Sequence, residues 1–296
     1  MKKFSAICIG EILWDSMPLG LFLGGAPFNV AYHLNKLGAD LKVVSCVGDD
    51  ELGHEALKRM SYNGLSKDFI QINNKQKTGF VSVDLGADGI PDYTIKKPAA
   101  WDFITHTREL QKALNKVDVI VFGTLAQRMD TSRKTIESIQ YSSALKVLDL
   151  NLRTPFDNKN IVYSSLKMAD FLKVNIEELH QLKDWFDLPA ENEKALDKLL
   201  NMFQIKCIAI THGSEGAEFY NGSDHVKSNG IQIDVLDTVG SGDAFLAALI
   251  TGYMNQLSIQ ECMLYANKLG AFVATCYGGT PDYTIREFKN IETLLN

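Results

Sequence analysis

Apolar runs with a strand-like pattern alternate with amphipathic helical patterns along most of this chain. A strand followed by a helix and another strand favours a parallel sheet, because the crossover helix returns the chain to the same edge. The sequence therefore predicts an α/β fold with a mainly parallel central sheet. The strand-like runs are Phe4–Gly10, Leu41–Gly48, Val117–Gly123, Leu145–Arg153, Ala169–Asn175 and Lys206–Gly213.

Two stretches interrupt this alternation and have the pattern of β-hairpins. Thr78–Lys97 alternates apolar and polar residues on both sides of a Gly-Ala-Asp-Gly turn, and the second stretch surrounds Asn221-Gly222. The first hairpin is expected to form a small lid to which Met17–Leu23 adds a strand; the alternative is an edge of the main sheet. We expect a single domain over residues 1–296 with a lid formed by about 15–25 and 78–100.

Composition restricts the partners of the chain. Its 296 residues carry a net charge of −6 without a basic run, which argues against nucleic acid and anionic membranes as partners. No apolar run approaches the length of a membrane span. The 5 cysteines lack metal-binding spacing, and their odd number without a signal peptide fits a cytoplasmic protein.

One glycine-rich stretch, Asp237–Asp243, has the pattern of an anion site. A short apolar run at Gly230–Leu236, expected to be a strand, leads into it, and a helical pattern follows it. Unpaired N–H groups at a helix N-terminus attract anions, and glycines let a ligand approach them. Asp243 would repel a resting anion, so it is either a residue favoured by the helix dipole or a general base beside a phosphate site.

Other polar residues follow the carboxyl ends of predicted strands, where open α/β sheets bind ligands. Gly24-Gly25-Ala26-Pro27 also opens a helix whose first turn contains Asn29. The chain lacks the P-loop motif and the dinucleotide GxGxxG motif, so its anion site is of another type. A glycine-rich helix terminus beside a carboxylate suits phosphoryl transfer. The residues after strands are Asp15, Asn151, Arg153, Asn175, Thr211, Gly213 and Asp237.

These motifs resemble those of the ribokinase-like, or PfkB, sugar kinases. GGAPFN at Gly24–Asn29 and DTVGSGDAF at Asp237–Phe245 are similar to the two signatures of the family and occur in the same order. Between them, Asn175 and Glu178 resemble the NxxE element. Thr211, Gly213 and Gly216 resemble the nucleotide turn TxGxxG. The resemblance covers almost the whole chain and implies a three-layer α/β/α sandwich with a small β-sheet lid.

The resemblance also implies a role for each residue that matches a motif. Asp243 would deprotonate the primary hydroxyl of the sugar, and Gly240, Ser241 and Gly242 would form the anion hole. Sugar hydroxyls would be held by Asp15, Gly25, Asn29 and Arg153. The ATP site would contain Asn175, Thr211, Gly213, Gly216 and Asn267. Glu178 would help to place Mg²⁺ through water, and a monovalent cation such as K⁺ would lie near Asp237, Val239, Cys276 and Gly279.

Further motifs are similar to those of fructokinases, namely GEILWD, PAAWD (Pro98–Asp102) and DLNLR (Asp149–Arg153). Ser241 stands where most members of the family have Ala. The resemblance implies an ATP-dependent kinase that converts fructose to fructose 6-phosphate and forms a homodimer through its lid. The alternatives are a kinase for ribose, a nucleoside or a sugar acid such as 2-keto-3-deoxygluconate, and a non-catalytic sugar- or nucleotide-binding regulator.

Overall fold

The computed structural model describes residues 3–17, 19–85 and 91–284. Within these ranges, one sheet has nine strands in the order β13-β12-β11-β10-β9-β8-β1-β4-β5. All neighbours from β11 to β5 pair in parallel, while β12 and β13 extend the sheet with antiparallel pairs. In chain order, the strands are β1 (Ser5–Ile9), β4 (Asp40–Gly48), β5 (Ile70–Asn73), β8 (Val119–Gly123), β9 (Leu145–Asp149), β10 (Phe171–Asn175), β11 (Cys207–Thr211), β12 (Gly216–Tyr220) and β13 (His225–Asn229).

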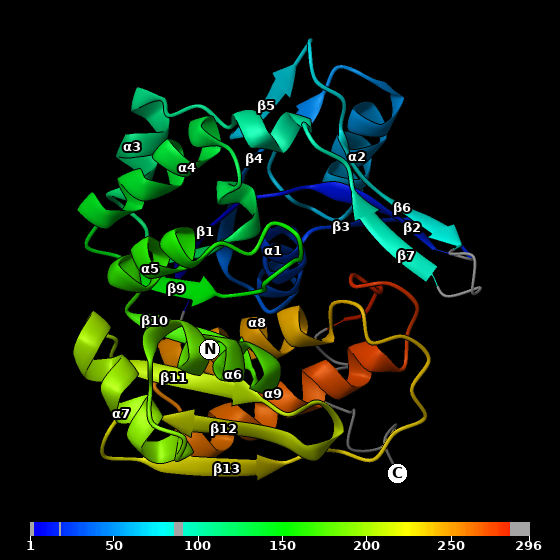
Figure 1. Ribbon diagram of the computed structural model, residues 1–296. Helices are drawn as coiled ribbons and strands as arrows, with labels where there is room; N and C mark the ends of the chain where they lie inside the picture. Colours follow the sequence, from blue (N-terminus) through cyan, green and yellow to red (C-terminus); the bar gives the residue numbers. More distant parts are fainter. Residues whose placement is uncertain (1–2, 18, 86–90, 285–296) are drawn as a thin grey trace.

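Helices cover both faces of this sheet, so the body of the molecule has three layers (Figure 1). One apolar core packs α1, α2, α8 and α9 against the sheet, and a second packs α3 to α7 against the opposite face. Because both faces are buried, the parallel strands read as continuous apolar runs. The helices are α1 (Ala26–Lys36), α2 (Glu51–Tyr62), α3 (Arg108–Leu114), α4 (Asp130–Glu137), α5 (Lys159–Met168), α6 (Ile176–Phe186), α7 (Asn192–Phe203), α8 (Ser241–Met254) and α9 (Ile259–Ala274).

A smaller sheet projects from the body in the order β3-β2-β6-β7 (Figure 1). Its strands are β2 (Leu13–Met17), β3 (Gly20–Gly24), β6 (Gly79–Leu85) and β7 (Pro91–Ile95). The predicted hairpin is confirmed by the antiparallel pairing of β6 with β7, whereas its turn at 86–89 lies outside the described residues. The predicted strand near Met17–Leu23 corresponds to β3, which joins the small sheet by pairing with β2 rather than with the hairpin itself.

One predicted strand is wrong. Residues 230–236 have no regular secondary structure. They follow β13, the edge strand of the large sheet, but turn away toward α9 instead of pairing with a strand that the structure describes. Leu236 donates its backbone N–H to the carbonyl oxygen of Ala274 at the end of α9. Ile231, Ile233 and Val235 of this segment instead line a cavity beside α9.

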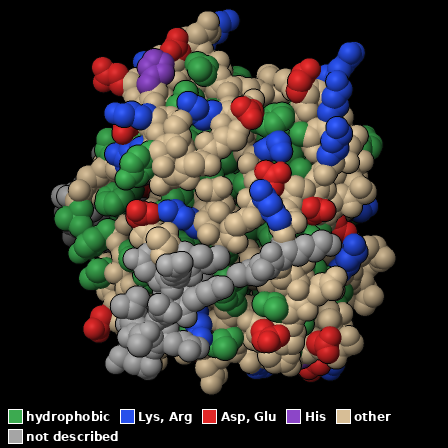
Figure 2. Space-filling model, turned by 180° about the vertical axis from the view of Figure 1, so that it is seen from behind, with side chains coloured by type: hydrophobic (Ala, Val, Ile, Leu, Met, Phe, Trp, Pro, Cys, Tyr) green, Lys and Arg blue, Asp and Glu red, His purple; other side chains and the backbone are tan. Residues whose placement is uncertain are grey.

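The surface mixes charges of both signs. On the face seen in Figure 2, acidic and basic side chains are interspersed. None of the described helices combines the length and the apolarity that crossing a membrane requires. Cys8, Cys46, Cys207 and Cys262 are buried as free thiols, and Cys276 is half-buried.

Candidate active site

The glycine-rich stretch forms the N-terminus of α8. Gly240 is its N-cap residue and has a φ of 76°, a left-handed conformation that favours glycine. A Cβ atom on Gly240 would collide with the Cα atom of Gly279, so the loop after α9 packs directly on this turn. The first turn of a helix has N–H groups without intrahelical acceptors. These groups and the compact glycine turn form a site suited to an anion.

Asp243 lies in this first turn and is buried. Its Oδ2 atom accepts a 2.8 Å hydrogen bond from Nδ2 of Asn29, a residue of α1. Burial raises the pKa of Asp243 to about 6, and the nearby carboxylate of Asp149 adds to this rise. Lys173, the Asn29 hydrogen bond and Arg153 act in the opposite direction. A carboxylate with this pKa is ionised at neutral pH and can accept a proton.

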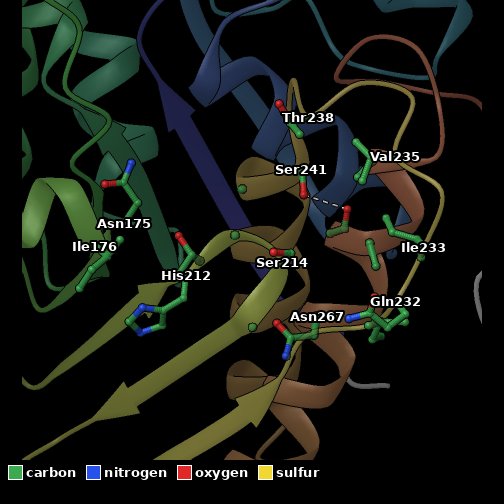
Figure 3. Close-up of a pocket in the computed structure, with 18 of the residues that line it drawn as sticks. Asn175, Ile176, His212, Ser214, Gln232, Ile233, Val235, Thr238, Ser241 and Asn267 are labelled. Atoms are coloured by element: carbon green, nitrogen blue, oxygen red, sulfur yellow. Dashed lines mark hydrogen bonds between the residues drawn. The ribbon is translucent and has the colours of Figure 1, made fainter.

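Two adjoining cavities meet at α8. The first, of about 650 Å³, contains Asp243 and extends beneath the small sheet, and the second, of about 600 Å³, extends over β11 and α9. Asn175, Thr211, Thr238 and Gly242 line both cavities. Figure 3 shows Asn175, Ile176 and His212 on one side of the second cavity and Ile233 and Val235 on the other. The shared residues place the carboxylate of Asp243 close to the opening between two ligand-sized spaces.

The structure brings almost all of the predicted site residues to these cavities. Cys276 and Gly279 line neither cavity and belong to the loop that packs on Gly240. The first cavity contains Asp15, Gly25, Asn29, Asn151, Arg153, Asn175, Glu178, Thr211, Asp237, Val239, Gly240, Gly242 and Asp243. The second contains Asn175, Thr211, Gly213, Gly216, Ser241, Gly242 and Asn267.

Asp15 reaches the cavity from the small sheet, within the segment of about 15–25 that was expected to form the lid. It lies in β2 of the small sheet rather than at the carboxyl end of β1, because the chain turns after β1 and pairs with β6. A Cβ atom on Gly24 would lie 2.7 Å from Oδ2 of Asp15, which explains the first glycine of the pair. A Cβ atom on Gly25 would collide with the backbone oxygen of Glu11. The double glycine therefore lets two acidic residues approach the start of α1.

Asn175 and Glu178 form a capping box at the start of α6. Oδ1 of Asn175 accepts from the backbone N–H of Glu178 at 2.7 Å, and Oε2 of Glu178 accepts from the N–H of Asn175 at 2.9 Å. Oε1 of Glu178 also accepts from the N–H of Leu152, which follows β9. Burial raises the pKa of Glu178, although Lys173 opposes the rise. Glu178 thus ties together two loops at the edge of the first cavity.

Asp237 joins the two loops that were predicted to hold a monovalent cation. Its Oδ1 atom accepts from the N–H of Val239 at 3.0 Å, and its Oδ2 atom accepts from the N–H of Gly278 at 2.9 Å. The described residues contain no group of three or more His, Cys, Asp or Glu side chains able to hold a metal ion. Mg²⁺ commonly needs only one or two carboxylates when phosphate oxygens and water supply its other ligands, and Glu178 fits that requirement.

Ser241 and Asn267 make contacts that connect the second cavity to its walls. Oγ of Ser241 donates to the carbonyl oxygen of Gly270 at 2.9 Å, so this side chain joins α8 to α9 (Figure 3). Nδ2 of Asn267 donates to Oγ of Ser228 at 2.9 Å, and so holds α9 against β13. The side chains of Ser241 and Asn267 therefore line the cavity while they donate hydrogen bonds to neighbouring elements.

Sequence reasoning missed three charged groups of the first cavity region. Nζ of Lys173 lies 2.9 Å from Oδ1 of Asp149, and both side chains are buried in neighbouring strands. Glu11 is 2% exposed, and burial raises its pKa to about 7. The available signal was the position of Lys173 within an apolar strand, because a buried lysine needs a charged partner.

The PAAWD motif has a structural role, because two of its residues contact Arg128. Asp102 and Arg128 form a buried ion pair in which Nε of Arg128 lies 2.8 Å from Oδ1 of Asp102. The guanidinium group of Arg128 also packs over the ring of Trp101 and donates to the carbonyl oxygen of Lys96, next to the end of β7. This cluster anchors the small sheet to the body of the protein.

The layered fold and an aspartate at a glycine-rich helix terminus between two cavities define a class of phosphoryl-transfer enzymes. The chain matches the model of the pfkB family carbohydrate kinases over residues 17–286 and belongs to this family.

Known relatives and solved structures resemble the chain over nearly its full length. It is 26% identical to probable fructokinase-6, chloroplastic, from Arabidopsis thaliana, covering 95% of this chain and 80% of that protein. It is 27% identical to fructokinase-2 from Solanum lycopersicum, covering 93% of this chain and 92% of that protein. The structure of fructokinase with bound ATP from Xylella fastidiosa superposes with a TM-score of 0.87 at 21% identity, covering 99% of both chains. The structure of fructokinase from Vibrio cholerae in its fructose-, ADP- and calcium-bound form superposes with a TM-score of 0.84 at 21% identity, covering 98% of this chain and 99% of that chain.

Proposed function

We propose that this pfkB family kinase transfers the γ-phosphoryl group of ATP to the primary hydroxyl of fructose and makes fructose 6-phosphate. The observation that carries this proposal is the position of Asp243, which is buried at the glycine-rich start of α8 beside Gly242, a residue of both cavities. The fructokinase names of the curated relatives favour fructose as the sugar.

The first cavity would hold the sugar. Its lining combines hydrogen-bonding groups from the small sheet, α1 and the loop after β9, which suits a polyhydroxylated ligand. Asp15, Asn29 and the backbone at Gly25 would bind hydroxyl groups, and Arg153 would approach the sugar or the transferred phosphoryl group. The small sheet would act as a lid over this cavity and exclude water.

The second cavity would hold ATP. Ile231, Ile233 and Val235 provide an apolar wall suited to a purine base. The phosphates would extend past Thr211, Gly213 and Gly216 toward the N-terminus of α8. The related fructokinase structures from Xylella fastidiosa and Vibrio cholerae, with bound ATP and ADP respectively, support this nucleotide class. Bound Mg²⁺, placed through water by Glu178, would neutralise phosphate charge.

In this mechanism, Asp243 accepts the proton of the sugar hydroxyl as the hydroxyl oxygen attacks the γ-phosphorus atom of ATP. The N–H groups of the turn Gly240–Gly242 stabilise negative charge on the transferred group. Asn29 fixes the orientation of the Asp243 carboxylate through their hydrogen bond. Asp237, Val239, Cys276 and Gly279 would surround K⁺, which would stabilise the loops on either side of the anion hole.

A coupled assay of ADP release with fructose, ribose, mannose and 2-keto-3-deoxygluconate tests the proposal. We expect the highest kcat/KM with fructose. A preference for ribose or the sugar acid would contradict fructose as the substrate, and sugar-dependent ADP release would exclude a non-catalytic regulator. Replacement of K⁺ by tetramethylammonium at constant ionic strength tests the monovalent-cation site. If K⁺ binds there and stabilises the loops, its removal should lower the rate.

The small sheet would also mediate a homodimer. Leu19 is 63% exposed and Leu21 is 41% exposed, and an apolar edge of this kind is stabilised by burial against a second copy. Equilibrium sedimentation is expected to show a dimer that Leu19→Glu with Leu21→Glu weakens. A monomer at all concentrations would contradict this assembly.

A further inference from the structure

Lys173 is a buried cation directly beside the N-terminus of α8. It lies within β10, is 6% exposed and lines the cavity that contains Asp243. A Cβ atom on Gly242 would lie only 3.2 Å from Nζ of Lys173. The ammonium group therefore lies beside the glycine that borders both cavities.

A carboxylate in the neighbouring strand orients this ammonium group. Lys173 in β10 pairs in register with Asp149 in β9, and Nζ lies 2.9 Å from Oδ1 of Asp149. Oδ2 of Asp149 is buried and makes no hydrogen bond with the part of the chain that the structure describes. The pair is thus held by the sheet itself, with the ammonium at the edge where the strands meet α8.

The ammonium group remains charged in this position. Burial alone would lower the pKa of Lys173, but the carboxylates of Asp149, Glu178 and Asp243 raise it above its usual value. Arg153 is the other cationic side chain among the described residues of this cavity, and it is exposed. Lys173 is therefore the buried positive charge beside the proposed base.

We propose that Lys173, oriented by Asp149, contacts the phosphoryl group during its transfer and stabilises the charge on its oxygen atoms. This inference rests on the proposed kinase function. The bond between the sugar oxygen and the γ-phosphorus forms, the bond from that phosphorus to the ADP oxygen breaks, and the hydroxyl proton passes to Asp243. Lys173 keeps all of its protons throughout.

Stability alone is a poor reason to keep this pair. A buried ion pair costs desolvation energy that an apolar pair of similar size avoids, so its retention is weak evidence for a stabilising role. A fixed cation beside a helix N-terminus is instead well placed for a group whose charge is spread over several oxygens. Lys173 would be a catalytic residue, and Asp149 a positioning residue.

The main test compares Lys173→Met with the double variant Asp149→Asn/Lys173→Met, which removes both charges and so avoids leaving a buried carboxylate unpaired. We expect both variants to lower kcat by about 10²- to 10³-fold, with the KM for sugar changed less than about threefold. Thermal unfolding will show whether the double variant is folded. A folded double variant with kcat within about threefold of wild type would overturn the proposal.

Lys146→Met provides a matched control. Lys146 in β9 forms a similar ion pair with Asp170, with Nζ and Oδ2 2.9 Å apart, but neither residue lines the two cavities. We expect this variant to lose stability and keep its kcat. An equal loss of kcat in Lys146→Met and Lys173→Met would show a general structural effect and overturn the assignment.

A binding measurement separates phosphoryl contact from structural support. Calorimetry with ADP, Mg²⁺, sugar and aluminium fluoride reports binding of a mimic of the transferred group. We expect Lys173→Met to weaken the aluminium fluoride complex by about 100-fold or more while the Kd for ADP alone stays unchanged; equal affinities would overturn the proposal. If wild type phosphorylates ribose rather than fructose, only the sugar assignment fails and the variants are measured with ribose. A wild type inactive on every sugar tested overturns both proposals.

Discussion

The side-chain amide of Asn29 donates a hydrogen bond to Oδ2 of Asp243 at 2.8 Å, and so connects two residues 214 positions apart. Asn29 belongs to the first turn of α1 after the double glycine, and Asp243 belongs to the first turn of α8. The two helices pack against each other on the same face of the sheet. This contact turns two distant glycine-rich motifs into one site.

Asn29→Ala removes this hydrogen bond and a polar group from the proposed sugar cavity. We expect kcat/KM for the sugar to fall by about 10- to 100-fold, which corresponds to a buried hydrogen bond of about 1–3 kcal/mol, while the KM for ATP changes little. Steady-state kinetics with each substrate varied in turn measure the effect. Asn35→Ala is the control, because Asn35 lies in the same helix and binds the carbonyl oxygen of Asn63. Equal effects of the two variants would contradict a specific role for Asn29.

The rate is expected to depend on the ionisation of Asp243. Because burial raises the pKa of Asp243 to about 6 and the base acts in its ionised form, kcat should fall about tenfold per pH unit well below this value. The Asn29 hydrogen bond lowers this pKa, so Asn29→Ala should move the acidic limb to higher pH. A pH–rate profile from pH 5 to 9 measures the acidic limb of the wild type and of the variant. An acidic limb that is identical in the variant would argue against Asp243 as the titrating group.

Gly240→Ala should destabilise the protein and reduce activity through the turn that begins α8. An alanine at positive φ costs about 1–2 kcal/mol, and here its Cβ would also collide with Gly279. Gly38→Ala isolates the first cost, since Gly38 has a φ of 94° but open space around its Cβ position. Urea unfolding should show a larger loss for Gly240→Ala, together with a fall in kcat that Gly38→Ala lacks. Equal losses of stability would show that the contact with Gly279 is unimportant.

Glu11 should make stability depend on pH. Its pKa is about 7 in the folded protein and about 4.5 when the chain is unfolded, because burial disfavours the carboxylate. Between these values the unfolded chain loses the proton and the folded chain keeps it, so stability decreases as the pH rises, by up to about 3 kcal/mol. Glu11→Gln cannot ionise and should gain stability relative to wild type from pH 5 to pH 8. Urea unfolding at both pH values checks this, and a constant difference between the proteins would contradict it.

Much of the fold was predictable because it follows local patterns. Apolar runs separated by helical patterns predicted the parallel sheet, and the alternation around Thr78–Lys97 predicted the pairing of β6 with β7. Glycines before α1 and α8 marked the two helix N-termini that border the site. These features depend on residues close together in the chain, so the sequence carries them directly.

The sequence by itself determined the α/β alternation, the two glycine-rich helix starts and most of the residues around the two cavities. Only the tertiary structure decided that residues 230–236 form a cavity wall rather than a strand, and that the strand containing Asp15 pairs with β6. It also decided that Lys173 lies opposite Asp149 on the neighbouring strand and beside Gly242. Strand order, register and helix packing set these relationships, and they arise from contacts between distant segments that no local pattern encodes.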